Sequence, residues 1–209
     1  MQQAYILGVT GHRDIHPQAF QEVKEKTGAW LDDLLFKKPN KQIIVLSPLA
    51  SGADQLVAEL SLERGLALHV TLPFPLERYI EDFKSDKERE QFYSLYEQAV
   101  HAYVPELIQG KKNDASCYFA VGAHVAQHSH LLFALWNGAK SPEKVGGTAH
   151  IVRCQLQGFP DEFTSPSALS HRETVWIRTQ RSGDSSLSPK GIHLTNDRYI
   201  IIGKDDNNG

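Results

Sequence analysis

The chain has 209 residues, of which 41% are hydrophobic, and its 22 Lys plus Arg against 25 Asp plus Glu give a net charge of -3. This length fits one large domain with a substantial core. Because the charges form no long block of one sign, the composition argues against a basic track for nucleic acid or for anionic lipid. We therefore expect no nucleic-acid partner and no direct membrane contact.

The sequence also predicts a cytoplasmic chain. Its two cysteines, Cys117 and Cys154, are too few and too far apart for a disulfide framework, which indicates a reducing compartment. Met1-Gln2-Gln3 leads straight into a predicted strand, without the basic segment that begins a secretory signal. The longest apolar run, Leu131 to Trp136, is far shorter than the ~20 residues of a membrane-spanning helix. Any membrane contact would come from an effector domain or a partner protein.

Strand-like and helix-like segments alternate along the chain, which is typical of an α/β fold with a mainly parallel sheet covered on both faces. The predicted strands are the run that begins at Tyr5, then Ile43 to Leu46, Leu66 to Leu72, Leu131 to Trp136 and Thr174 to Thr179. The predicted helices run from Pro17 to about Lys37, from Ala53 to Gly65, from near Glu77, from Asp86 to Leu107, from Cys117 to Gln127 and from Thr148 to about Leu156. Gly110 to Ser116 is expected to be a polar loop, and Ile192 to Ile202 a C-terminal β-hairpin that turns at Asn196-Asp197.

Four predicted loops follow the carboxyl ends of strands, where open parallel sheets bind their ligands. They are Gly8 to Arg13, Ser47 to Asp54, Pro73 to Pro75 and Trp136 to Thr148. The candidate ligand-binding residues are Gly8, Thr10, Gly11, His12, Arg13, Ser47, Ser51, Gly52, Asp54, Pro73, Phe74, Trp136, Asn137, Gly146, Gly147 and Thr148.

Gly146-Gly147-Thr148 is the sharpest of these signals. Two glycines and a hydroxyl before a helix can form a phosphate cradle from backbone donors, although an ordinary helix entry has the same composition. The first loop offers backbone amides at Thr10 and Gly11 and a fixed charge at Arg13, which can hold a phosphate in a bidentate fashion. The alternative is a tight turn with surface residues.

The other two loops also allow a structural and a functional interpretation. Ser51 fits the N-cap of a helix with Asp54 at its third position, as in a capping box, while Gly52 would expose amides to an anion. Phe74, between two prolines, suits stacking on a base or packing into the core, and Trp136 has the same ambiguity.

Metal and triad chemistry are poorly supported. His124, His128 and His130 lie near one another in sequence, and His150 and Cys154 have helical spacing, but neither group supplies about four zinc ligands. No Gly-x-Ser-x-Gly elbow occurs in the sequence. We expect no metal and no cofactor.

Four motifs follow one another within about residues 4 to 180. They are Gly8-Val9-Thr10-Gly11-His12-Arg13; Ser47-Pro48-Leu49-Ala50-Ser51-Gly52-Ala53-Asp54; Leu72-Pro73-Phe74-Pro75 with Tyr79 and Asp82-Phe83; and Leu135-Trp136-Asn137-Gly138 with Gly146-Gly147-Thr148-Ala149. Together they resemble the SLOG superfamily, which joins DprA-like DNA-processing proteins with LOG phosphoribohydrolases.

The resemblance implies a Rossmann-like three-layer α/β/α domain with a doubly wound sheet that binds nucleotides or nucleotide-derived ligands. It also implies, for several prokaryotic members, a sensor of ADP-ribose-type signals coupled to effectors in conflict systems. We accordingly expect a nucleotide-binding domain over residues 1–180, a polar loop and hairpin beside it over 181–202, and a disordered tail over 203–209.

The chain departs from the LOG pattern at the residues that serve catalysis. LOG hydrolases carry Pro-Gly-Gly-x-Gly-Thr-x-x-Glu, whereas here Val145 precedes the glycines and no such glutamate follows Thr148. Because cleavage of an N-glycosidic bond needs a positioned acid or base, this departure favours sensing over hydrolysis. Asp54, Glu77 or Asp82 could substitute for the missing acid.

Three functional hypotheses remain open at this point. The first is a sensor of an NAD derivative or another nucleotide second messenger, and the second is a phosphoribohydrolase or nucleoside deoxyribosyltransferase. The third and weakest is DprA-like handling of single-stranded DNA, which the lack of a basic track disfavours. The long helix and the hairpin could support a homo-oligomer, or they could simply cover the sheet.

Overall fold

The computed structural model describes residues 4–138, 145–170, 172–184 and 200–202, and its strands form one seven-stranded sheet. The strands are β1 (Tyr5–Gly11), β2 (Ile43–Ser47), β3 (Ala67–Thr71), β4 (His101–Tyr103), β5 (Leu131–Trp136), β6 (Glu173–Arg178) and β7 (Ile200–Ile202). The helices are α1 (Pro17–Lys37), α2 (Ala53–Leu62), α3 (Leu76–Tyr79), α4 (Asp86–Tyr96), α5 (Asp114–Gln127) and α6 (Thr148–Gln157). Short 3-10 helices are η1 (Ile80–Asp82), η2 (Glu106–Ile108) and η3 (Asp161–Phe163).

β1 lies in the middle of the sheet, whose strand order is β4-β3-β2-β1-β5-β6-β7. It pairs in parallel with both β2 and β5, and parallel pairing continues outward to β4 on one side and to β6 on the other. The chain therefore winds outward from β1 to β4 and then crosses back to β5, so the strand order reverses between β1 and β5. This topology confirms the predicted Rossmann-like α/β fold with a mainly parallel, doubly wound sheet.

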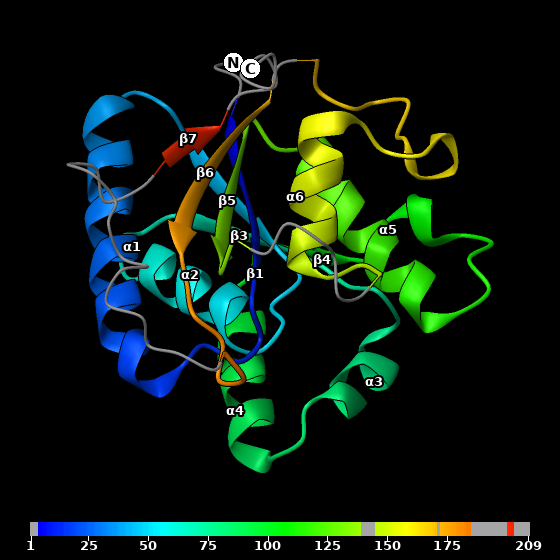
Figure 1. Cartoon of the computed structure of the whole chain (residues 1–209), viewed down its shortest axis with the longest axis horizontal. Helices are drawn as coiled ribbons and strands as arrows, with labels where there is room; N and C mark the ends of the chain where they lie inside the picture. The colour runs from blue at the N-terminus through cyan, green and yellow to red at the C-terminus, as the bar shows by residue number, and fades with distance from the viewer. Residues whose placement is uncertain (1–3, 139–144, 171, 185–199, 203–209) are drawn as a thin grey trace.

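Helices cover both faces of this sheet (Figure 1). α1, α2 and α4 share one buried core with one side of the strands, whereas α5 and α6 share a second core with the other side. Adjacent residues of β5 show the division, because Phe133 belongs to the first core and Leu132 to the second. A strand covered on both faces is apolar at every position, which explains why β5 reads Leu-Leu-Phe-Ala-Leu-Trp.

α1 begins at Pro17, as predicted, and fixes how the chain leaves β1. Proline suits the first helical position because its missing N–H would have no helical partner there. The Nδ1 atom of His16 caps the helix by accepting the N–H of Gln18 at 3.2 Å. On the buried face, Trp30 stacks on Phe133 with the ring centroids 4.3 Å apart. The turn between β1 and α1 is thereby held at the carboxyl edge of the sheet.

The segment after α4 differs from the prediction of one helix from Asp86 to Leu107. α4 begins with a capping box between Ser85 and Glu88 but ends at Tyr96, and β4 then adds an edge strand beside β3. The three residues of β4 are all exposed, so their side chains form no buried-strand pattern. The prediction was wrong because β4 joins the sheet through its backbone, which side-chain periodicity does not report.

Two other predicted segments can be compared with the structure. The polar loop expected up to Ser116 is shorter than predicted, because α5 begins at Asp114, where the side chain of Asn113 accepts the N–H of Ser116 at 2.9 Å. The hairpin turn expected at Asn196-Asp197 and the tail from 203 to 209 lie outside the described residues. β7 pairs antiparallel with β6.

Among the helices of the described residues, none combines the length and apolar character needed to cross a membrane.

Candidate functional site

A cavity of about 630 Å³ lies at the carboxyl ends of β1 and β5, where the strand order reverses. Its walls come from the turn after β1, the segment around the start of α2, α3 with η1, one side of α5, the end of β5 and the start of α6. Cavities that hold nucleotide-sized ligands have volumes of roughly 300–1,000 Å³. Position and size therefore make this cavity the candidate site.

Most of the sequence-predicted residues line this cavity. They are Thr10, Gly11, His12, Arg13, Asp54, Pro73, Trp136, Asn137, Gly146, Gly147 and Thr148. Gly8, Ser47, Ser51, Gly52 and Phe74 are not among the lining residues. The geometry brings residues of all four predicted loops to one place, with Pro73 representing the third, while their role in ligand binding stays a prediction.

The glycines of the first two loops let these loops pack on each other. A Cβ at Gly11 would lie 2.3 Å from the Cβ of Ala53, and a Cβ at Gly52, whose φ is +81°, would lie 2.4 Å from the carbonyl oxygen of Arg13. The N–H of Ala53 donates to the carbonyl of His12 at 3.0 Å. These glycines bring the start of α2 against the turn after β1. Gly8 packs similarly, because a Cβ there would lie 2.2 Å from Oγ of Ser129.

The predicted capping box at the start of α2 does not form. The N-cap residue is Gly52 rather than Ser51, and it makes no side-chain cap. Asp54 instead points back along the chain, where its Oδ2 accepts the N–H of Ala50 at 3.3 Å. Close packing of Gly52 against Arg13 accompanies the shift of the N-cap from Ser51 to Gly52, and this tertiary contact has no signature in the local sequence. Ser47 has a local role, because its Oγ accepts the N–H of Leu49 at 3.1 Å.

The start of α6 forms one wall of the cavity. Gly147 is its N-cap residue and supplies no side-chain cap. Gly146 adopts a φ of +77°, and a Cβ there would lie 2.9 Å from the backbone nitrogen of Phe119 on α5. In the described part of the chain, the amides of Gly147, Thr148 and Ala149 donate no hydrogen bond. Free amides at a helix N-terminus attract anions, because the partial positive charge of the helix dipole lies there.

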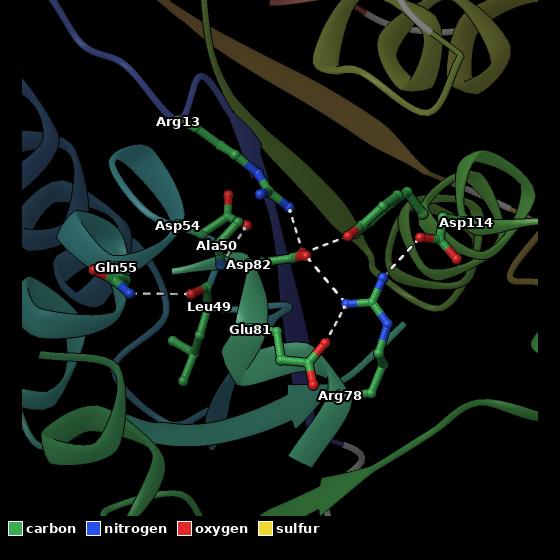
Figure 2. A network of polar contacts seen from close by, with 10 residues as sticks. Arg13, Leu49, Ala50, Asp54, Gln55, Arg78, Glu81, Asp82 and Asp114 are labelled. Carbon is green, nitrogen blue, oxygen red and sulfur yellow. Dashed lines mark hydrogen bonds and ion pairs between the residues drawn. The ribbon is translucent and has the colours of Figure 1, made fainter. Parts of the chain in front are cut away.

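Arg13 brings a cation to the cavity from the turn after β1 (Figure 2). Its Nη2 lies 3.7 Å from Oδ2 of Asp82, and its guanidinium lies over the ring of Tyr118 at 5.4 Å. The hydroxyl of Tyr118 donates to the same Asp82, and Nη1 of Arg78 approaches that carboxylate at 3.7 Å. The long, half-exposed contact between Arg13 and Asp82 is a weak ion pair, so a ligand anion can compete for Arg13.

Asp54 is the most buried acid of the cavity wall, with only 4% of its surface exposed. Burial raises its pKa to about 7, while the nearby charge of Arg13 and the N–H of Ala50 oppose this shift. Its Oδ1 is buried and has no hydrogen-bond partner in the described part of the chain. Figure 2 shows the carboxylate directed toward the side chain of Arg13. Near neutral pH, Asp54 can therefore hold or release a proton.

His12 is neutral in this site. Its Nε2 accepts the N–H of Asn137 at 2.9 Å, which requires that nitrogen to be unprotonated. Burial lowers its pKa, and the cation of Arg181 lowers it further, against the opposing hydrogen bond with Asn137 and two nearby acids. Burial likewise raises the pKa of Tyr79, another lining residue, so its phenol stays protonated.

Several lining residues were missing from the predicted set. Tyr118 and Gly122 reach the cavity from the side of α5, and a helix of apolar pattern offers no local signal for such a role. Arg181 follows the carboxyl end of β6, so the rule that pointed to the other loops could have found it. Its Nε donates to Oδ1 of Asp14 at 3.0 Å, which holds the segment after β6 against the turn after β1.

The histidines considered as metal ligands, His124, His128, His130 and His150, are not among the lining residues of the cavity. His124 and His128 have ring centroids 4.1 Å apart, and burial, with His128 nearby, lowers the pKa of His124 to about 3. His150 stacks on Phe119 and accepts the N–H of Gly146 through Nδ1 at 3.3 Å. Within the described ranges, three or more His, Cys, Asp or Glu residues nowhere gather as a metal site would require.

Comparisons with known proteins give a distant structural similarity. No protein-family model matches the chain, and no curated protein sequence matches it. Among solved structures, DNA processing protein A (DprA) from Streptococcus pneumoniae is similar with a TM-score of 0.48 and 13% sequence identity. The match covers 74% of this chain but only 47% of that protein, so the chain spans about half the length of DprA.

Proposed function

We propose that the cavity between β1 and β5 binds a nucleotide or a nucleotide-derived ligand, and that the chain serves as a binding and sensing domain. The observation that carries this proposal is the start of α6, where the amides of Gly147, Thr148 and Ala149 at the cavity wall have no hydrogen-bond acceptor among the described residues. A phosphate placed there would satisfy these donors and the helix dipole together. Arg13, a lining residue from the turn after β1, would add a charge-assisted hydrogen bond.

The remaining walls suit the rest of a nucleotide. Trp136 and Tyr118 present aromatic surface to the cavity, on which a base could stack. Phe74, which the sequence suggested for this role, instead packs edge-on against Tyr118 with ring centroids 5.3 Å apart. Phe74 therefore supports Tyr118 from behind in this proposal.

The ligand that we favour is an NAD derivative of the ADP-ribose type or another nucleotide second messenger. The support for this choice is the resemblance of the four motifs to the SLOG superfamily, together with the missing glutamate after Thr148. In this proposal the chain is the sensor part of a prokaryotic defence or stress system, and self-association passes the binding signal to an effector.

A second candidate function is cleavage or transfer at an N-glycosidic bond. One observation favours it: Asp54, a cavity acid, has a pKa of about 7 because of its burial. An acid that titrates near neutral pH is suited to proton transfer to a departing base. The two candidates differ in whether free base appears.

Thermal unfolding in the presence of NAD, ADP-ribose, cyclic ADP-ribose, AMP, cyclic dinucleotides and inorganic pyrophosphate tests both candidates. A ligand at 100 times its dissociation constant should stabilise the fold by about 2.7 kcal/mol. Chromatography of the same mixtures measures released base. A shift without base release supports sensing, and protein-dependent base release supports the enzyme. If none of these compounds shifts the melting temperature, the phosphate site is wrong.

A further inference from the structure

Asp54 carries an unused hydrogen-bond acceptor at the cavity wall. Its Oδ2 accepts the N–H of Ala50, whereas its buried Oδ1 has no partner among the described residues. A buried polar atom without a partner costs free energy, and native proteins leave few of them. The first turn of α2 therefore retains an acceptor that the described part of the chain does not use.

The groups around Asp54 indicate which kind of hydrogen-bond donor could pair with its Oδ1 atom. Arg13 lies near enough to influence its charge, but the two side chains form no ion pair within 4.0 Å in the described part of the chain. The buried phenol of Tyr79 faces the same cavity. Tyr118 donates a hydrogen bond to Asp82, and both residues contact the side chain of Arg13. Because a cation is already nearby, a neutral donor such as a hydroxyl suits this acceptor better than a second cation.

We infer that Asp54 accepts a hydrogen bond from one ribose hydroxyl of the bound nucleotide, so that the site selects nucleotides that carry this hydroxyl over the deoxy form that lacks it. This inference rests on the proposed function, because it needs a nucleotide whose phosphate lies at α6. The phosphate contacts at the other wall are common to both sugar types and cannot discriminate between them. Asp54 is the specificity-determining residue in this arrangement.

The choice between the two sugars follows from the cost of leaving Asp54 unpaired. The hydroxyl that bonds to Asp54 supplies the donor that Oδ1 lacks, whereas a sugar without this hydroxyl leaves the acceptor shielded and unsatisfied. Hydrogen bonds to charged groups correspond to a roughly 10- to 100-fold difference in affinity. We expect AMP to bind this much more tightly than one of its two deoxy forms, the 2′-deoxy or the 3′-deoxy form, and about as tightly as the other.

Isothermal titration calorimetry with AMP, 2′-deoxy-AMP, 3′-deoxy-AMP and inorganic pyrophosphate tests the inference in the full chain. The variant Asp54→Ala should lower the ratio of AMP affinity to deoxy-AMP affinity to near 1 while pyrophosphate binding persists. Ser61→Ala is the matched control, because Oγ of Ser61 is another buried unpaired atom on α2 but does not line the cavity. This control should keep the wild-type ratio.

Asp54→Leu provides a second variant if Asp54→Ala does not fold. Leucine has nearly the branched shape of aspartate but no polar side-chain atom, so it cannot pair with a hydroxyl and the ratio should fall here too. Equal binding of AMP and both deoxy forms to the wild type, or an unchanged ratio in the Asp54 variants, would overturn the inference while the phosphate site stands. Binding of pyrophosphate without AMP would overturn it as well. If neither pyrophosphate nor AMP binds, the proposed function itself fails.

Discussion

The backbone N–H of Asn137, just after β5, donates a 2.9 Å hydrogen bond to Nε2 of His12, just after β1. This bond joins the two strand ends between which the strand order reverses. It also requires His12 to be neutral, in agreement with the burial that lowers its pKa. The geometry of the cavity between these two strand ends therefore depends on the protonation state of the His12 imidazole.

We predict that this bond weakens in acid. The pKa of His12 is lower in the folded chain than the ordinary value of 6.5, so its contribution to stability is complete above pH 6.5 and is lost as pH falls through the folded-state pKa. His12→Gln, which keeps an acceptor that does not titrate, should lose less stability between pH 7.5 and pH 5 than the wild type. His12→Ala should lose about 1–3 kcal/mol at pH 7.5, because the N–H of Asn137 is left unpaired.

Chemical denaturation at the two pH values measures both effects. The comparison of Gln with wild type isolates His12 from the other buried histidines, which titrate equally in both proteins. Parallel pH dependence in the wild type and in His12→Gln would contradict the assignment of Nε2 as an acceptor.

A second prediction concerns the packing of α2 on the turn after β1. Gly52→Ala should destabilise the fold by more than about 2 kcal/mol, since the new Cβ would meet the backbone of Arg13 at 2.4 Å in addition to the strain of a φ of +81°. Gly65→Ala is the matched control. Gly65 has a φ of +72° but no atom within 4 Å of an added Cβ, so it should cost only about 1–2 kcal/mol. Equal losses of unfolding free energy in the two variants would show that the contact with Arg13 is unimportant.

The central strands could be predicted from sequence because they are buried on both faces. Leu131–Trp136 forms a continuous apolar run, and β5 has the predicted bounds. β4 could not be found in the same way, because all its residues are exposed and its place in the sheet depends only on pairing with β3. Side-chain patterns report burial, and they are silent where a strand contributes only its backbone.

The residues of the candidate site also divide into those that sequence rules could find and those that depend on contacts distant in sequence. The carboxyl-end rule predicted that Arg13, Asp54 and Gly147 lie together, and all three line the cavity, since this rule depends on topology alone. Tyr118 was missed because it enters from the flank of α5, and its bond to Asp82 spans 36 positions in sequence. The false capping box at Ser51 had the same origin, because a distant backbone contact decided where α2 begins.

The third prediction tests the start of α6. Gly147→Asp should place a carboxylate over the free amides, as a good N-cap residue does, and should exclude a phosphate by occupation and by charge. Gly147 has a φ of -74°, which any residue can adopt, so the fold should be as stable as the wild type or slightly more stable. Pyrophosphate affinity should fall by at least about tenfold. Gly147→Ala, which adds a Cβ without a cap, should keep that affinity, and an equal loss in both variants would point to steric exclusion alone.

The fourth prediction separates binding from stability at Arg13. Arg13→Gln should change the unfolding free energy by less than about 1 kcal/mol, because its pair with Asp82 is long and partly exposed. Its pyrophosphate affinity should fall roughly tenfold or more. Arg78→Gln is the control, since Arg78 also lies 3.7 Å from Asp82 but does not line the cavity. If Arg78→Gln weakens binding as much as Arg13→Gln does, the effect acts through Asp82 and not through direct contact with the ligand.

The last prediction is that Asp54 reduces the stability of the ligand-free fold. Its pKa rises from an ordinary 3.8 to about 7 on folding, so its stabilising contribution is complete only below about pH 4 and is lost as pH rises through 7. Asp54→Asn removes this titration and should therefore be more stable than the wild type at pH 8, by about 2–4 kcal/mol, with a much smaller difference at pH 5. Urea denaturation at the two pH values measures this difference, and Glu90→Gln, at an exposed acid of α4, is the control. A wild-type chain that is more stable than Asp54→Asn at pH 8 would mean that Oδ1 is not an unsatisfied buried acceptor. If replacement of Asp54 raises stability and abolishes ribose selectivity, the buried carboxylate destabilises the ligand-free chain and gains its missing hydrogen bond from the ligand.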